Sequence, residues 1–214
     1  MKRRAAAFSM LLGLSGLLGL ILGCQPGDEL RERRYADGAP WSEIRLRNGV
    51  PHGLWRTWYP DQRPRSEGNY LDGLREGPWV AWWENGTKQS VGSFRIGEPH
   101  GNWEHWFENG KPASRGSYLD GRRDGTWIEW FGDGKLRAEA SYVDGLQDGL
   151  VRRYWGTGSP REEATYVLGV REGPARSFFE DGTLLIEGQY TEGRKSGTWT
   201  RYRRDGTVFS KETH

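Results

Sequence analysis

The sequence contains almost no cysteine, and the one that it has stands at an informative position. Cys24 is the only cysteine among 214 residues. A single thiol excludes an intramolecular disulfide, so packing alone must stabilise any folded domain.

Long helical patterns are also absent from most of the chain. After the first 24 residues, glycine or proline interrupts every window long enough for a helix with a 3.6-residue apolar period. Leucine, isoleucine and valine are scarce there, whereas the whole chain has 32 glycines and 12 tryptophans. This composition argues against a thick two-layer core and indicates an all-β fold.

The chain has no large charge excess of either sign. It carries 31 Lys and Arg against 29 Asp and Glu, and its formal net charge of +2 includes Lys2, Arg3 and Arg4. Without these three residues the formal charge is −1, with both signs interspersed. Nucleic-acid binding needs a basic stripe, so we expect no nucleic-acid partner.

Catalytic motifs are missing as well: there is no G-x-S-x-G elbow, Walker loop or dinucleotide fingerprint. His52 and His100 share a repeat position but should lie ~20 Å apart, and the other two histidines have no obvious partner. Asp120 and Asp144 should lie ~10 Å apart beside turn glycines, which favours turn formation over catalysis. We expect a non-enzymatic protein with no catalytic residue, no metal site and no cofactor.

What the chain does have is a repeat of 24 residues without insertion or deletion. We number the positions of each block as columns. The seven blocks begin at Ile44, Gly68, Gly92, Gly116, Ala140, Ala164 and Gly188. A half block, residues 30–43, precedes them. Columns six and ten are glycine in every block, and together they are expected to frame a turn. The column-ten glycines are Gly53, Gly77, Gly101, Gly125, Gly149, Gly173 and Gly197.

Two further columns are mostly aromatic. Column three holds Leu46, Tyr70, Phe94, Tyr118, Tyr142, Tyr166 and Tyr190. Column fifteen holds Trp58, Trp82, Trp106, Trp130, Tyr154, Phe178 and Tyr202. Tryptophan and tyrosine dominate many protein interfaces, and column fifteen is therefore the candidate binding surface.

Each block predicts two short antiparallel strands, at about columns twenty-one to four and eleven to sixteen, separated by Asp-Gly or Asn-Gly turns. The predicted fold is an elongated, twisted β-meander of about fourteen strands, ~65 to 70 Å long. Columns twenty-one, twenty-three, one and three share a small and aromatic face, which should be the only core. The Gly or Ala of column one should give clearance for a neighbouring aromatic ring. Charged residues at both ends should guard the open edges.

Trp127 and Trp130 are three residues apart and cannot share a face of a regular strand. Either a bulge occurs there, or the two rings serve opposite faces and part of the aromatic ladder is available for binding.

The N-terminal segment reads as an export signal. Lys2, Arg3 and Arg4 precede the apolar run 5–22, and Gly23 and Cys24 follow it. The resulting organisation is a signal peptide over residues 1–23, a short linker over 24–29 and the repeat array over 30–214. An uncleaved membrane anchor, or a plain signal peptide with an incidental cysteine, remain the alternatives.

The residues around Cys24 resemble a bacterial lipobox. The resemblance implies lipidation of Cys24 after cleavage before it, and therefore a membrane anchor in the bacterial cell envelope. Gln25 follows the cysteine, and by resemblance to enterobacterial sorting this favours the outer membrane over the inner one.

The block pattern G-x-Y-x-D-G-x-x-x-G-x-W-x-x-W-F-x-x-G, as at residues 116–134, resembles the MORN-repeat variant of bacterial YwqK-family antitoxins. The resemblance covers about residues 30–214. Val151 and Ala175 depart from it at the usual Trp column, and Gln62 departs at a turn glycine. What the family label implies is the neutralisation of a partner toxin.

Three functions are compatible with these features. The first is a lipid-anchored envelope scaffold that binds an unknown protein partner. The second is a module that binds peptidoglycan or another glycan by stacking exposed tryptophans on sugar rings. The third is the antitoxin activity that the resemblance implies.

Overall fold

A computed structural model describes residues 27–214, which form seventeen β-strands. The predicted signal peptide and Cys24 lie outside these residues. The first strands of the repeats are β2 (Pro40–Arg47), β4 (Pro64–Leu71), β6 (Lys88–Arg95), β8 (Pro112–Leu119), β10 (Leu136–Val143), β13 (Pro160–Val167), β15 (Leu184–Thr191) and β17 (Val208–Thr213). The second strands are β1 (Asp28–Arg34), β3 (Val50–Trp58), β5 (Leu74–Trp82), β7 (Glu98–Trp106), β9 (Arg122–Trp130), β11 (Leu146–Gln147) with β12 (Gly149–Tyr154), β14 (Val170–Phe178) and β16 (Arg194–Tyr202).

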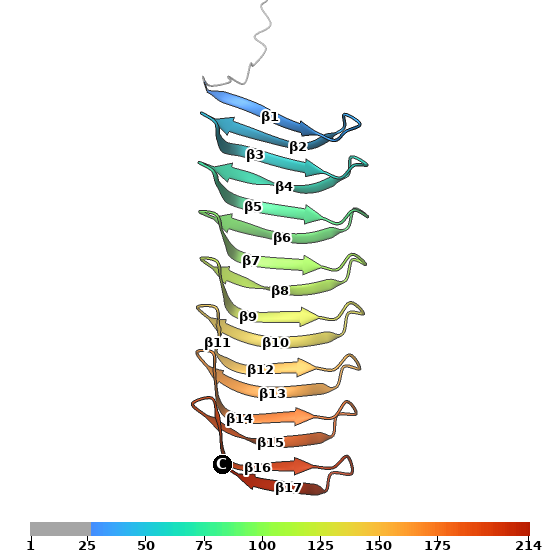
Figure 1. The fold of residues 1–214 in the computed structure, drawn as a ribbon, viewed down its shortest axis with the longest axis vertical. Helices are drawn as coiled ribbons and strands as arrows, with labels where there is room; N and C mark the ends of the chain where they lie inside the picture. The colour runs from blue at the N-terminus through green and yellow to red at the C-terminus, as the bar shows by residue number, and fades with distance from the viewer. Residues whose placement is uncertain (1–26) are drawn as a thin grey trace, which may run out of the picture.

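All strands belong to one open antiparallel sheet in which each strand pairs with the next along the chain, except that β11 and β12 both pair with β10 (Figure 1). The predicted all-β meander is confirmed. The total exceeds fourteen because the array has one further strand at each end and because Asp148 separates β11 from β12. Within residues 27–214, no helix is long and apolar enough to cross a membrane.

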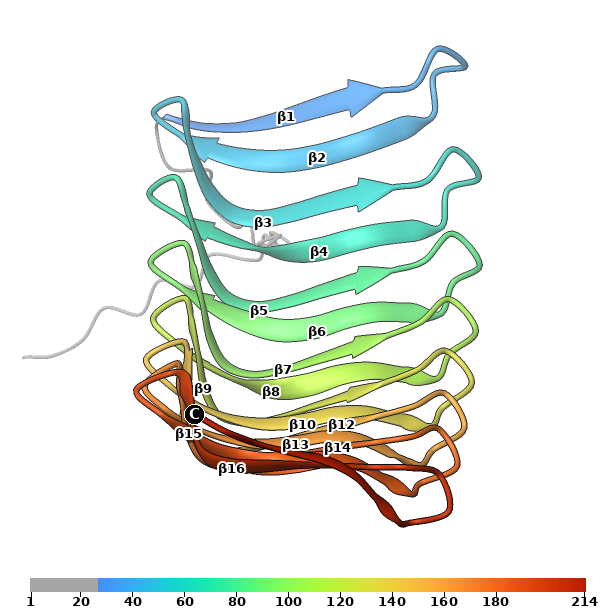
Figure 2. The same ribbon diagram turned by 60° about the horizontal axis from the view of Figure 1, so that its bottom comes forward.

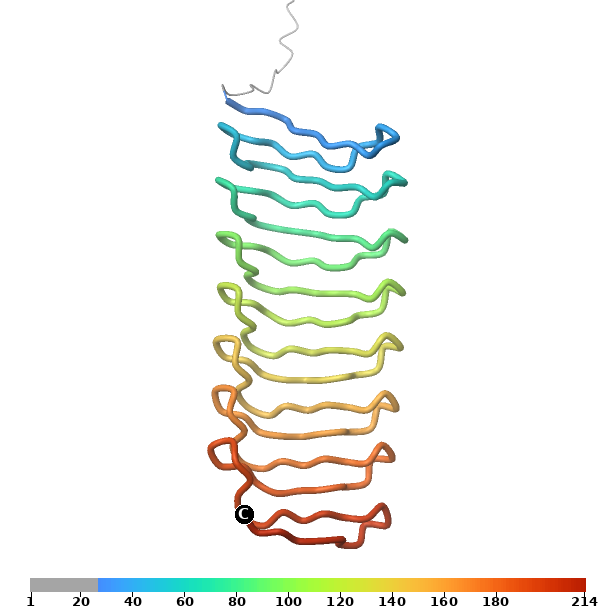
Figure 3. Tube along the Cα trace, in the orientation of Figure 1, coloured from blue at the N-terminus to red at the C-terminus, as the bar shows by residue number. Residues whose placement is uncertain are grey.

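The sheet is curved across its width. Both ends of each strand rise toward the same side, so the sheet forms a trough that twists along its length (Figure 2). The tight turns stack along one edge and the wider loops along the other, as the chain trace in Figure 3 shows. We call the face on which Trp127 lies the inner face and the face on which Trp130 lies the outer face.

The tight turns consist of columns five and six. Asp120 and Gly121 both have positive φ, 48° and 79°, which defines the type I′ turn that the Asp-Gly pair predicts. The Gly121 amide also donates a hydrogen bond to the Pro99 carbonyl of the preceding repeat, at 2.9 Å. Each turn therefore joins neighbouring repeats as well as neighbouring strands.

The column-ten glycines do not frame this turn, contrary to our expectation. They belong to the second strands, where positive φ bends the backbone, and a bulge opposite Gly116, between Arg115 and Ser117, accommodates the bend. The second strand consequently begins at column seven, Arg122 in β9, rather than at column eleven. A glycine pattern alone cannot distinguish a bend inside a strand from a turn. The corrected residues are Gly53, Gly77, Gly101, Gly125, Gly149, Gly173 and Gly197.

The core is one layer of side chains on the inner face. Trp127 of column twelve is 2% exposed and lies against the backbone of Gly116, where an added Cβ would be only 2.3 Å from the indole ring. Its Nε1–H donates to the Ser117 carbonyl at 3.0 Å. The predicted clearance at column one is confirmed, and Gly68, Gly92 and Gly188 repeat the contact with Trp79, Trp103 and Trp199.

In blocks two to seven, column one and column twelve vary together, whereas block one combines Ile44 with Trp55. Where column one is alanine, at Ala140 and Ala164, column twelve is the smaller Val151 or Ala175, and all four side chains are buried. The volume added at one position is thus removed at the other, as close packing requires.

The two tryptophans of one strand occupy opposite faces. Trp127 is buried on the inner face, whereas Trp130 is half-buried on the outer face. A bulge also occurs here, because the pairing of β9 with β10 shifts between Leu136 and Ala138, but it lies on the neighbouring strand. The regular alternation of β9 from 127 to 130 is therefore kept.

Candidate binding surface

Column fifteen forms an aromatic stripe along the outer face. The Arg115 guanidinium lies 5.5 Å from the centre of the Trp130 ring. The Tyr202 hydroxyl donates to the Glu187 carboxylate at 2.7 Å, and this bond raises the pKa of Tyr202 above its usual value. The stripe therefore combines aromatic rings with charged neighbours. Its members, all half-buried, are Trp58, Trp82, Trp106, Trp130, Tyr154, Phe178 and Tyr202.

A hollow of about 110 Å³ lies between Trp106 and Trp130. Pro112 pairs with Trp106 across the strands and lines the hollow, and Glu104 and Arg115 add charged groups to it. Aromatic side chains and arginine are the residue types that dominate the binding energy of protein interfaces, and the hollow contains both.

Ion pairs cross the outer face between columns thirteen and twenty-four. All of their side chains are at least 31% exposed, so each pair adds little to stability and stays accessible to a partner. The nitrogen–oxygen distances are 2.9 Å for Arg56–Glu67, 3.5 Å for Arg152–Glu163 and 3.3 Å for Arg176–Glu187.

The inner face carries a charged network that the sequence analysis missed. Arg171 donates to the hydroxyls of Tyr166 and Tyr190 at 2.9 and 3.0 Å and to the Glu162 carboxylate. Glu162 also accepts a bond from Arg153 at 2.6 Å. The bond to Tyr166 is the main cause that raises the pKa of Arg171.

Column eight held the signal for this network. Arg75, Arg123 and Arg171 recur there in every second block. The bend at column ten places such side chains over the core, since Arg75 lies 4.9 Å from the centre of the Trp79 ring and Arg123 lies 4.2 Å from that of Trp127. Cation–π contacts of this kind each contribute ~0.5–1 kcal/mol when exposed and ~2 when desolvated.

Comparison with known protein families identifies the type of repeat in part of the chain. Four tandem segments match the MORN repeat variant. They cover residues 99–120, 123–144, 147–167 and 171–192. Their starts are 24 residues apart, in agreement with the period of the sequence. No curated protein matches the chain.

The matched MORN-type segments include an interruption of the tryptophan column. Where Val151 replaces tryptophan, a hollow of about 220 Å³ opens on the inner face. Glu129, Arg137, Gln147 and Arg153 are among its polar lining residues. Glu129 is already paired with Arg137 at 3.6 Å, so part of this polar lining is satisfied internally.

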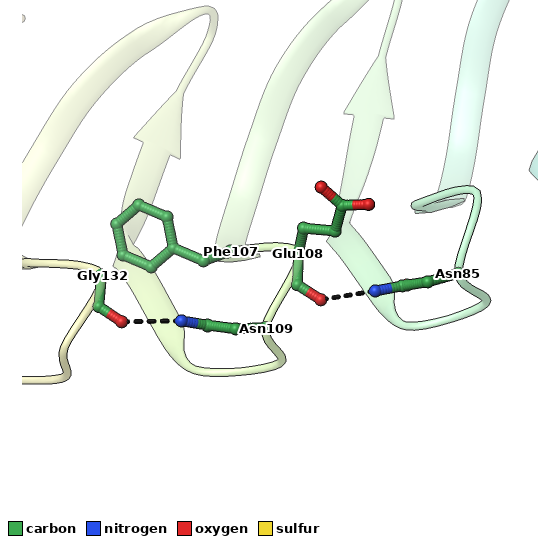
Figure 4. Close-up of a pocket in the computed structure, with 5 residues that line it drawn as sticks. All are labelled: Asn85, Phe107, Glu108, Asn109 and Gly132. Carbon is green, nitrogen blue, oxygen red and sulfur yellow. Dashed lines mark hydrogen bonds between the residues drawn. The ribbon is translucent and has the colours of Figure 1, made fainter.

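The wide loops form a shallow hollow of about 510 Å³ at one edge of the trough (Figure 4). Asn85 donates to the Glu108 carbonyl at 2.7 Å, and Asn109 donates to the Gly132 carbonyl at 2.8 Å. Both amides therefore join successive repeats, and this hollow is part of the array of wide loops.

The histidines of column nine pair with aspartates of the next turn. His52 Nδ1 is 3.3 Å from Asp72 Oδ1, and His100 Nδ1 is 3.5 Å from Asp120 Oδ1. Both aspartates have positive φ in type I′ turns, in agreement with the turn-forming role predicted for this column. In the part of the chain that the structure describes, no group of three or more His, Cys, Asp or Glu could hold a metal ion.

His105 lies apart from those pairs, on the inner face. Its ring stacks on Trp103, with the ring centres 5.7 Å apart and the planes inclined by 21°. Burial and, to a smaller extent, the charge of Arg123 lower the pKa of His105. Both effects favour the neutral imidazole.

Proposed function

We propose that the chain is a non-enzymatic, lipid-anchored scaffold of the bacterial cell envelope that binds a protein partner through column fifteen. The observation that carries the proposal is the stripe of half-buried rings on the outer face, with the Trp106–Trp130 hollow at its centre. Repeats of the MORN type generally contact proteins or membranes and are generally non-enzymatic, which supports this assignment.

The architecture supports binding of a partner on the exposed outer face rather than inside a cavity. Column twelve packs in the core, so its indoles are withdrawn from any partner. The rings of column fifteen lie on the opposite face, one in each repeat. Because each repeat contributes two strands, successive rings are ~10 Å apart. A partner can therefore meet several equivalent rings at once, and their binding energies combine.

The partner surface is tested with a photocrosslinking amino acid in the full chain, in intact cells. We expect a defined protein adduct with the probe at Trp106, and its loss when Trp130→Ala is added. The matched control places the probe at Ile96, which is 70% exposed in a tight turn. Equal adducts at both positions, or none at Trp106, contradict the proposed surface.

The glycan alternative is separated by retention on purified cell-wall sacculi. If the stripe stacks on sugar rings, Trp82→Ala and Trp106→Ala reduce retention of the chain. If the wild type and both variants are retained equally, any binding to sacculi occurs outside the stripe. The antitoxin alternative requires a toxic product from an adjacent small gene, with growth restored when the repeat protein is co-expressed.

The anchor is tested separately from the binding surface. We expect that Cys24→Ser abolishes incorporation of a palmitate analogue and releases the protein from the membrane fraction. Unchanged labelling and fractionation contradict lipidation of Cys24. Separation of inner and outer membranes on a density gradient then tests the localisation, for which Gln25 favours the outer membrane.

A further inference from the structure

The two ends of the sheet are open edges. Over residues 27–214, β1 pairs only with β2 and β17 pairs only with β16. Every residue of β1 is exposed, and Ser210 is the one residue of β17 that is half-buried. An unpaired antiparallel edge of this kind is a template for another strand.

The repeat itself determines which strand fits each edge. By its columns β1 is a second strand, and β17 is a first strand. Throughout the array a second strand follows a first strand, as β3 follows β2. The β1 edge of another copy is therefore the strand that would come next after β17.

The register of that contact follows from the pairs inside the chain. Column twenty-four lies opposite column thirteen, as Glu43 lies opposite Arg56, and column one lies opposite column twelve, as Ala164 lies opposite Ala175. The same register applied between two copies produces three pairs. It places Lys211 opposite Glu32, Glu212 opposite Arg31, and Ser210 opposite Arg33.

The charges at the two edges are complementary in this register. Lys211 meets Glu32 and Glu212 meets Arg31, which are two opposite-charge pairs in adjacent positions. Cross-strand pairs of opposite charge are favourable, and like charges directly opposite are unfavourable.

The same residues fit their own chain poorly. Glu32 lies opposite Glu43, a like-charge pair, and Lys211 lies opposite the uncharged Thr200. Three pairs inside the array have arginine at column thirteen and glutamate at column twenty-four, as in Arg56–Glu67, whereas Glu104 opposite Arg115 already has the polarity of the proposed contact. Glu32 does form an exposed bond to Arg34 on its own strand, at 2.6 Å, but such pairs contribute little. The charges of Glu32 and Lys211 therefore match each other better than they match the residues opposite them in their own chain.

We infer that this chain assembles head to tail, with β17 of one copy pairing with β1 of a second copy to continue the sheet. The contact joins two different surfaces, so it does not close into a symmetric dimer and extends into a filament. In such a filament column fifteen continues from copy to copy, with Arg34 of β1 at each junction between Tyr202 of one copy and Trp58 of the next.

Crosslinking of the full chain tests the contact directly. The double variant Glu32→Cys with Lys211→Cys places two thiols on facing strands, where directly opposite Cβ atoms lie about 4.5–5.5 Å apart. A short bismaleimide should then produce a ladder of dimers, trimers and longer products. All of these proteins carry Cys24→Ser, so that no other thiol is present, and each single variant should give no ladder. A dimer from Glu32→Cys alone would show that two β1 edges pair with each other, and it would overturn the inference, as would monomers from the double variant.

Charge reversal tests the register independently. Glu32→Lys should weaken self-association about tenfold, because it creates a like-charge pair with Lys211. Adding Lys211→Glu should restore association to near the wild-type level. Both positions are exposed, so we expect the variants to fold, and circular dichroism checks this. Additive effects of the two reversals, measured by analytical ultracentrifugation, contradict the contact.

Discussion

The packing of tryptophan on glycine predicts that Gly116→Ala is strongly destabilising. An added Cβ would lie 2.3 Å from the Trp127 ring, whereas ordinary contact begins near 3.4 Å, so the indole must retreat by about 1 Å. Overpacking of this kind costs about 1–3 kcal/mol. Loss of the bond from Trp127 Nε1 to the Ser117 carbonyl adds about 1 kcal/mol. Alanine recovers about 0.5–1 kcal/mol of strand propensity. We therefore expect a net loss of about 1–3.5 kcal/mol in the free energy of unfolding.

Urea unfolding followed by circular dichroism measures this loss, and hydrogen exchange shows whether it is confined to β8–β10. Repeat arrays can unfold in parts, so both measurements are needed. Gly132→Ala is the matched control, because no atom lies within 4 Å of a Cβ at that exposed loop position and its φ is not positive. The control should stay within about 0.5 kcal/mol of the wild type.

A second substitution distinguishes the ring contact from a general intolerance of alanine. Trp127→Val alone should cost about 3 kcal/mol through the cavity that it leaves. The double variant Gly116→Ala with Trp127→Val reproduces the pair at Ala140 and Val151. It should cost no more than Trp127→Val alone, which is a coupling of about 2 kcal/mol. Additive costs, or a Gly116→Ala variant as stable as the wild type, would refute the reasoning.

Three further predictions concern the turns, the loops and the inner face. Ile96→Asn should stabilise the protein by about 1 kcal/mol, because a β-branched residue is held there at φ 51° and asparagine tolerates that conformation; an unchanged or lower urea midpoint contradicts this. Asn109→Asp keeps the acceptor of its own loop but removes the donor to the Gly132 carbonyl. It should therefore lower the free energy of unfolding by about 1 kcal/mol. An effect below about 0.3 kcal/mol would show that the bond between repeats contributes little. Burial and Arg123 lower the pKa of His105, so the unfolded state binds its proton more readily. The resulting loss of stability should grow as the pH falls through 6.5 and beyond, and His105→Gln should flatten the pH dependence of the urea midpoint between pH 7.5 and 5.5; parallel profiles of the two proteins would exclude His105 as its origin.

The repeat period predicted the type and order of the strands because each block contains complete local signals. Asp120-Gly121 encodes its turn through two residues that accept positive φ. Gly125 is equally tolerant of positive φ, yet the structure uses it to bend a strand. The difference depends on the bulge opposite Gly116, which is a property of strand pairing and not of the local sequence.

The candidate surface was partly predictable for the same reason. The three-residue spacing of Trp127 and Trp130 restricted the solutions to a bulge or to opposite faces. The choice needed the register of the next strand, where the bulge occurs. The inner network was harder to find, because Arg171 meets Tyr190 only after the bend at column ten brings column eight over the core.

The interrupted tryptophan column divides the array mechanically. Ring-to-ring contacts run without a gap from Trp55 to Trp127, and the next one joins Tyr190 to Trp199. Between them, alanine, valine and an arginine–glutamate–tyrosine network replace the edge-to-face ring contacts. A pulling force applied along the array should therefore concentrate its extension in repeats five and six. The repeats on either side of this region should resist extension more strongly.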